Sequence, residues 1–227
     1  MTQPAELKSW SYSSAKLYEQ CPRKYYHLRV IKDIKDDNNK EHLLYGNEFH
    51  SAAEHYVRSG APLPAHFKFA KQQLDSLIQL PGDKYCEFKM GLTKDLQPCE
   101  FFAEDCWYRG IVDLLIINGD KARIIDYKTG KSSKYADISQ LELMALCIFK
   151  HFPQIKSVKA GLLFVVAGIF KPAAFQVEQE HVYWRGWLEL IKRIERSFQT
   201  GIWNAKKTGL CKAHCPVISC PHNGLNT

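Results

Sequence analysis

The sequence has no long apolar run. No stretch of its 227 residues approaches the roughly 20 consecutive apolar residues that an α-helix needs to span a bilayer. The first ten residues, MTQPAELKSW, also lack the apolar segment of a secretory signal peptide. We therefore expect a cytoplasmic protein.

Internal repeats and low-complexity segments are also lacking, and no basic tail is present. The composition, 45% hydrophobic and 24% charged, is typical of a globular protein, so we expect a single domain over residues 1–227. The 31 basic residues exceed the 24 acidic ones, which gives a net charge of +7 spread along the chain. This charge permits a polyanionic partner but does not require one.

A phosphate-binding loop is missing, although the stretch IIDYKTGKSS at residues 124–133 ends like one. The Walker A pattern needs a second glycine five positions before Gly130, and that position holds Ile125. A β-branched residue inside an apolar strand fits burial and not a phosphate cradle. We therefore expect no ATP binding, and any ATP-driven unwinding would need a partner protein.

Hydrophobic periodicity predicts a mixed β-sheet flanked by helices, with a cysteine-rich C-terminal tail. Asn118-Gly119-Asp120 predicts a hairpin between two of the strands. We divide the chain into an N-terminal helix and loop (1–42), a core (43–200) and a tail (201–227). The expected helices are 13–22, 43–58, 65–80, 139–152 and 181–200, the expected strands are 85–92, 107–117, 122–128, 158–167 and 173–180, and the expected exposed loop is 33–40.

Two acids and a lysine lie on the hairpin strands. Because side chains alternate along a strand, Asp126 and Lys128 share one face. The hairpin would bring Asp113 of the preceding strand close to Asp126. Two neighbouring carboxylates repel each other, and a divalent cation relieves that repulsion. Each residue alone could equally form a surface ion pair.

The two strands, GIVDLL (110–115) and IIDYKTGK (124–131), resemble the core of the PD-(D/E)xK nuclease superfamily. The form DYKTG is similar to the RecB-like branch, which includes CRISPR-associated and bacteriophage exonucleases. GNEFH (46–50) resembles the GxxxH element of that branch, and CPRKYY (21–26) resembles its N-terminal element. The resemblance implies a restriction-endonuclease-like core and a prokaryotic or bacteriophage origin.

The same resemblance implies roles for six residues. Asp113, Asp126, His50 and the backbone carbonyl of Tyr127 would bind Mg²⁺ or Mn²⁺. Lys128 would orient the attacking water, and Gln140 would hold the substrate or the lysine. The branch often has a tyrosine four positions after this glutamine, where this chain has Met144. Glu87 faces either the metal or solvent.

The tail contains three cysteines in the spacing Cys-x3-Cys-x4-Cys, namely Cys211, Cys215 and Cys220. In a chain without a secretion signal, clustered cysteines indicate a metal more than disulfides, and a four-ligand site then needs one more ligand. RecB-like nucleases with iron–sulfur clusters join one early cysteine to three late ones, which implies Cys21. The resemblance favours a [4Fe–4S] cluster, and zinc, with His214 or His222 as a ligand, is the alternative.

The leading hypothesis is a Mg²⁺- or Mn²⁺-dependent deoxyribonuclease, with exonuclease action implied by the resemblance. Its partners would be DNA and a helicase, recombination or CRISPR-type protein. The alternative is a catalytically silent subunit that binds nucleic acid or assists assembly while retaining the fold and the cysteines. Residues suited to contact a DNA strand are Arg23, Lys24, Tyr25, Tyr26, Lys131, Lys134 and Tyr135.

Overall fold

The computed structural model describes residues 6–35, 40–134 and 136–226, so Tyr135 and part of the expected 33–40 loop lie outside the described residues. The chain divides into two compact units, one formed by residues 39–184 and the other by residues 1–38 together with 185–227. Each unit is described by itself below. The single domain over 1–227 stays a prediction.

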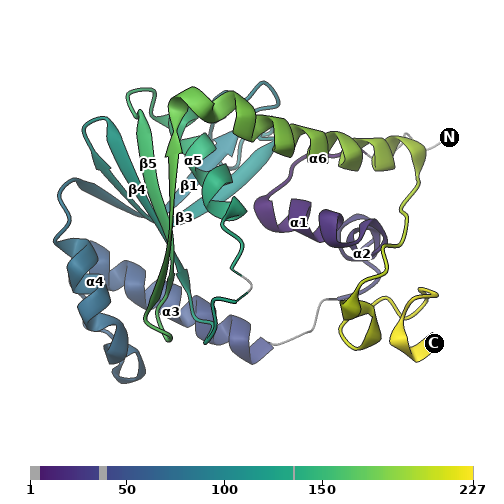
Figure 1. Cartoon of the computed structure of the whole chain (residues 1–227), viewed down its shortest axis with the longest axis horizontal. Helices are drawn as coiled ribbons and strands as arrows, with labels where there is room; N and C mark the ends of the chain where they lie inside the picture. Colours follow the sequence, from purple (N-terminus) through teal and green to yellow (C-terminus); the bar gives the residue numbers. More distant parts are fainter. Residues whose placement is uncertain (1–5, 36–39, 135, 227) are drawn as a thin grey trace. The chain divides into compact units, whose positions relative to one another are not determined.

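The larger unit is built on a six-stranded mixed sheet in the order β2-β1-β3-β4-β5-β6 (Figure 1). Strands β4 and β5 pair in parallel and the other neighbours pair antiparallel, so the predicted mixed sheet is confirmed. The connection between β4 and β5 contains helix α5, because parallel neighbours need a crossover. The strands are β1 Asp83–Leu92, β2 Pro98–Cys99, β3 Tyr108–Asn118, β4 Lys121–Lys128, β5 Ser157–Phe164 and β6 Ile169–Gln176.

The helical segments of this unit are α3 Lys40–Ser59, a 3-10 helix Ala65–Ala70 that continues into α4 Lys71–Ile78, α5 Ser139–His151 and a short 3-10 helix Val177–Gln179. The last helix, α6 Glu180–Thr200, begins here. The predicted helix 65–80 is therefore 3-10 in its first six residues. Strand β2 was not predicted, because a two-residue strand has no measurable periodicity. The last predicted strand begins four residues early, at Ile169.

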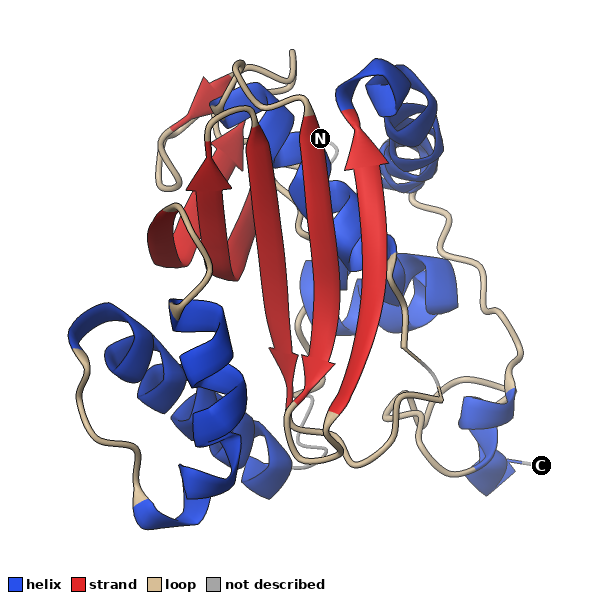
Figure 2. Ribbon diagram, turned by 60° about the vertical axis from the view of Figure 1, so that its left-hand side comes forward, coloured by secondary structure: helices blue, strands red, loops and turns tan. Residues whose placement is uncertain are grey.

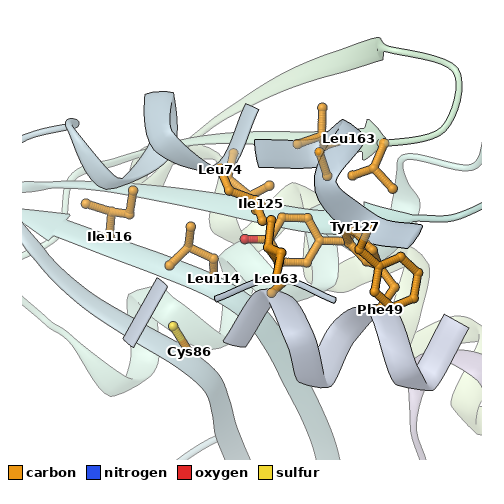
Figure 3. Close-up of a cluster of buried hydrophobic side chains, with 13 residues drawn as sticks. Phe49, Leu63, Leu74, Cys86, Leu114, Ile116, Ile125, Tyr127 and Leu163 are labelled. Atoms are coloured by element: carbon orange, nitrogen blue, oxygen red, sulfur yellow. The ribbon is translucent and has the colours of Figure 1, made fainter. Parts of the chain in front are cut away.

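Helix α3 and the segment 65–78 cover one face of the sheet through a buried apolar cluster (Figure 3). Phe49 of α3 is fully buried and packs edge-on against the Tyr127 ring at 5.8 Å. Leu114, Ile125 and Leu163 supply the sheet side. Leu115, Ile124 and Leu162 alternate with them and are also buried, so both faces of the central strands are covered.

The β3–β4 hairpin turns at Gly119, whose φ of 62° is a left-handed conformation that glycine adopts without a steric penalty. Pairing runs from Asn118↔Lys121 to Leu114↔Ile125 and then stops. Beyond it, β3 pairs only with β1 and β4 only with β5. Asp113 and Asp126 are the next residues on each strand, so both lie where the two strands separate.

The smaller unit holds the N-terminal helices and the tail. Helix α1 (Tyr12–Gln20) begins at a capping box formed by Ser11 and Ser14 and ends at Cys21, as predicted. It is followed by α2 (Pro22–Tyr25) and a π-helix over Tyr26–Val30. The Tyr18 hydroxyl lies 2.8 Å from the Ser197 hydroxyl and donates to the Arg193 carbonyl, which fixes α1 to the C-terminal part of α6.

The tail contains two short 3-10 turns, Gly209–Lys212 and Gly224–Asn226. Among the described residues, no helix is both long enough and apolar enough to cross a membrane.

Candidate active site

The site is built around Asp113, at the point where β3 and β4 separate. One oxygen of its carboxylate, Oδ2, accepts a hydrogen bond from the Tyr127 backbone N–H at 2.7 Å. The other, Oδ1, lies 3.2 Å from His50 Nδ1 on helix α3. Asp113 thus links the diverging strand ends to the helix that packs across them.

Three potential metal ligands converge here: His50, Glu87 and Asp113. Each offers one ligand atom, and these atoms all lie within 4.8 Å of one another. His50 Nδ1 is 4.0 Å from Glu87 Oε1 as well as close to Asp113. A histidine nitrogen with two carboxylate oxygens is a donor set suited to Mg²⁺ or Mn²⁺. The residues present therefore fit a divalent cation.

Glu87 comes from strand β1, and its backbone is strained. Its φ of 50° lies in the left-handed region, which is uncommon for any residue other than glycine and costs of order 1–3 kcal/mol. The pairing of β1 with β3 includes Cys86↔Leu114 and Phe88↔Val112 but is interrupted at Glu87. Sequence reasoning left this residue undecided, since nothing in the strand pattern predicts a positive φ.

Asp126, Lys128 and Gln140 form the second half of the site. Lys128 Nζ lies 2.7 Å from Asp126 Oδ2 and donates to Gln140 Oε1 at 3.0 Å. Asp126 is 3% exposed, whereas about a third of the Lys128 side chain remains accessible. Gln140, in the first turn of α5, therefore fixes the lysine from the side opposite the acid. The predicted strand geometry of Asp126 and Lys128 agrees with this arrangement.

The electrostatics show a site with excess negative charge. Burial, and then the charge of Asp113, raise the pKa of Asp126 to about 6 although Lys128 opposes the shift. Burial and the Asp113 charge also raise the pKa of Glu87. Burial alone would lower the pKa of His50, but the hydrogen bond to Asp113 and the surrounding acids raise it. A bound cation would stabilise all three deprotonated groups.

The side chains of Tyr127 and Met144, two positions considered in the resemblance, are buried among apolar residues. The Tyr127 side chain points into the apolar cluster, and its N–H is the group that contacts Asp113. A metal contact by its carbonyl stays a prediction. Met144, which replaces the expected tyrosine, is buried at 3% exposure and belongs to the apolar side of α5. Glu54 of α3 is not one of the three potential metal ligands and instead forms an ion pair with Arg58, with 2.9 Å between Arg58 Nη2 and Glu54 Oε1.

The four cysteines named from the sequence lie together in the smaller unit. Cys21, Cys211, Cys215 and Cys220 line one pocket, together with Arg23, Lys24 and Lys206 among others. Two backbone N–H groups point at sulfur atoms: that of Lys206 at Cys21 Sγ and that of Thr208 at Cys211 Sγ, each at 3.4 Å. Backbone N–H donors to sulfur are a common feature of sites where cysteines hold a metal or a cluster.

The tail is folded around its last cysteines by two asparagine side chains. Asn223 donates to the carbonyls of Cys215 and Val217, and Asn226 donates to those of Ile218 and Cys220. The cysteine spacing predicts neither contact. Asn223 is 4% exposed, so it is a buried polar group whose hydrogen bonds are satisfied by the backbone.

Two solved structures are similar to this chain, and the first of them supports the fold. The protein SSO0001 aligns with a TM-score of 0.50 at 12% sequence identity, covering 96% of this chain and 87% of its own. A protein from Eubacterium rectale, described as a candidate exonuclease, aligns with a TM-score of 0.49 at 12% identity, covering 91% and 87%.

No curated protein matches this sequence. A model of the PD-(D/E)XK nuclease superfamily matches residues 9–221, which is most of the chain. The matched range includes both strands of the hairpin, the helix that carries His50 and all four clustered cysteines. The chain therefore belongs to the PD-(D/E)XK nuclease superfamily.

Proposed function

We propose that the protein is a Mg²⁺- or Mn²⁺-dependent DNA nuclease of the RecB-like branch, acting as an exonuclease on DNA ends. One observation carries the proposal: His50, Glu87 and Asp113 converge where β3 and β4 separate, and Asp126 with Lys128 occupies the adjoining strand. Acids that can hold a divalent cation, with a lysine beside them, suit metal-assisted phosphodiester hydrolysis.

The cation would be held by His50, Glu87 and Asp113, with Asp126 as a further ligand. When bound, it would lower the pKa of water and neutralise charge on the phosphate oxygens. The protein's own contribution is placement. The Tyr127 N–H fixes the direction of the Asp113 carboxylate, and the packing of Phe49 against Tyr127 fixes α3 and hence His50.

Lys128 would position the attacking water and stabilise the charge that develops on the phosphate. Its ammonium group is pinned between Asp126 and Gln140, which lowers the entropy lost when it engages the substrate. Gln140 acts through Lys128 in this assignment and needs no contact with DNA.

The four cysteines would hold a [4Fe–4S] cluster, with zinc as the alternative. Four thiolates are the usual ligand set of such a cluster. Zinc accepts four thiolates as well, or a histidine in place of one of them. The role of the bound group would be structural, joining α1 to the tail.

The direct test is product analysis on end-labelled single- and double-stranded DNA. We expect cleavage with Mg²⁺ or Mn²⁺, complete loss of cleavage with a chelator, and release of short products from one end. Products of intermediate length from circular DNA would contradict the exonuclease assignment. If the protein binds DNA but cleaves no substrate under either metal, the silent binding subunit is the correct reading.

Glu87 gives a test of the metal site that does not depend on activity. We expect Glu87→Gln to weaken Mn²⁺ binding at least about tenfold, because one charged ligand is lost. Isothermal titration calorimetry or Mn²⁺ electron paramagnetic resonance measures the affinity. The matched control is Glu54→Gln, which removes a nearby acid paired with Arg58 and should leave the affinity within about twofold.

A second substitution at this position separates ligation from packing. Glu87→Gly removes the ligand and also relieves the strain of the positive φ, so the metal-free protein should be no less stable than the unmutated one. Thermal unfolding without metal, followed by the shift on adding Mn²⁺, measures both effects. Equal Mn²⁺ affinity in all variants would remove Glu87 from the site.

A further inference from the structure

On the face of the sheet that α3 and α4 cover, β6 is left open, together with the positions of Arg123 on β4 and Lys159 on β5. In Figure 2, helices α3 and α4 lie at the lower left and do not reach the edge strand β6 on the right of the sheet. The apolar cluster on this face reaches from β1 to Leu163 of β5 and includes no residue of β6. The layer of helices therefore ends before the sheet does.

An apolar groove occupies this position. It is bordered by Leu77 and Leu80 on one side and by β6 on the other, and between them lie Ile125 of β4 and its register partner Gly161 of β5. The ring of Phe170 is about half exposed and lies directly over Gly161, so close that a Cβ there would be 2.0 Å from the ring. The space over Gly161 is therefore filled by the Phe170 ring, which offers an apolar surface to a partner.

Two cations stand next to each other in this groove. Arg123 of β4 and Lys159 of β5 are direct partners in the parallel register, and both are exposed. Neither has an acidic partner among the residues that the structure describes. Like charges opposed across a ladder are destabilising, so this pair is unfavourable in the free protein. An anionic partner would convert it into a favourable contact.

From the shape, the apolar lining and this charge pair, we propose that the groove docks an acidic amphipathic helix of a partner protein. An eight-residue strand such as β6 spans about 26 Å, which matches a helix of about 18 residues. Lying beside α4, such a helix would extend the existing helical layer, with apolar residues on Ile125 and Phe170 and acidic residues at Arg123 and Lys159.

The test uses a fluorescently labelled helical peptide of about 18 residues, with leucines on one face and glutamates along the flanks. A second peptide carries lysine in place of every glutamate. We expect the unmutated protein to bind the acidic peptide saturably, as measured by fluorescence anisotropy. The Lys159→Glu variant should bind this peptide at least about tenfold more weakly. The variant Arg123→Glu combined with Lys159→Glu should instead prefer the lysine peptide.

The matched control is Lys171→Glu on β6. Lys171 pairs with Leu162, so alternation places it on the opposite face of the sheet, and its reversal should leave peptide binding unchanged. Metal-dependent DNA cleavage should also be unchanged in every variant, because none of these residues contacts the active site.

Four results would overturn the proposal. The first is that the acidic peptide shows no saturable binding. The second is that Lys171→Glu weakens peptide binding as much as Lys159→Glu does. The third is that the protein binds duplex DNA through Lys159 and does not bind the peptide. The fourth comes from filling the groove by Ala174→Trp: self-association lost in this variant, or a marked loss of its stability, would show that the protein's own chain occupies the groove.

Discussion

Replacement of Asp126 by alanine is expected to abolish metal-dependent DNA cleavage while DNA binding is retained. Asp126 is 3% exposed, feels the charge of Asp113 and lies 2.7 Å from Lys128 Nζ, so its removal takes away a proposed metal ligand and the partner of the lysine together. Charge stabilisation by a catalytic metal is worth several kcal/mol, which corresponds to a rate loss of about 10³-fold or more. Single-turnover cleavage of labelled DNA measures the rate.

The control is Asp120→Ala, which removes an exposed acid at the turn end of the same hairpin. Its cleavage rate should stay within about twofold of the unmutated protein, because surface substitutions away from a site have small effects. DNA binding by the Asp126 variant, measured by anisotropy, shows that the fold persists. If Asp126→Ala still cleaves DNA at the rate of the unmutated protein, Asp126 takes no part in the reaction.

The conservative variant Asp126→Asn sharpens the same test. It keeps the shape and can still hydrogen-bond to its neighbours, but it cannot carry the charge. We expect it to be as inactive as alanine while unfolding at the same temperature as the unmutated protein or higher, since a buried charge beside Asp113 is removed. Recovery of activity in this variant would assign Asp126 a positioning role.

The strand half of the site could be predicted from sequence because strand geometry is periodic. Asp126 and Lys128 share a face through alternation alone, and the Asn118-Gly119-Asp120 turn fixes the register that brings Asp113 beside Asp126. The helix positions follow from apolar spacing in the same way. Both inferences use only local geometry, and both agree with the observed elements.

Glu87 could not be assigned in this manner. Its position depends on a left-handed φ inside β1, where the ladder is interrupted, and no residue pattern encodes that departure. The groove beside α4 escaped prediction for a related reason. The groove depends on which part of a sheet face the helices leave uncovered, which is a property of tertiary packing. That Arg123 and Lys159 are neighbours follows only from the register of β4 and β5.

The cysteine site shows a third situation. The spacing of Cys211, Cys215 and Cys220 predicts three ligands, but the fourth came from resemblance, and Cys21 lines the same pocket. The wrapping of the tail by Asn223 and Asn226 was not predicted. Asparagine is common in loops, and nothing in the sequence distinguishes these two from solvated surface residues.

Under the proposed [4Fe–4S] assignment, replacement of Cys21 by serine is expected to remove the iron and to unfold the tail. The site joins residues far apart in the sequence, so losing one of four ligands releases the constraint that closes this long loop. We expect the protein to lose its visible absorbance and its stoichiometric iron, and residues 201–226 to become susceptible to proteolysis. Anaerobic purification, iron and sulfide analysis and limited proteolysis measure these changes.

The matched control is Cys99→Ser, since Cys99 is a partly exposed thiol on β2, outside the smaller unit. It should keep the full iron content and the protease resistance of the tail. A colourless unmutated protein with stoichiometric zinc would replace the cluster by zinc, and Cys21→Ser should then lose the zinc. If the anaerobically purified protein holds neither metal, or if Cys21→Ser retains its iron, the assignment of these four cysteines is wrong. Because the hydrogen bonds from Lys206 and Thr208 already point at two of the sulfurs, we expect the tail to refold when iron and sulfide are restored to the unmutated chain.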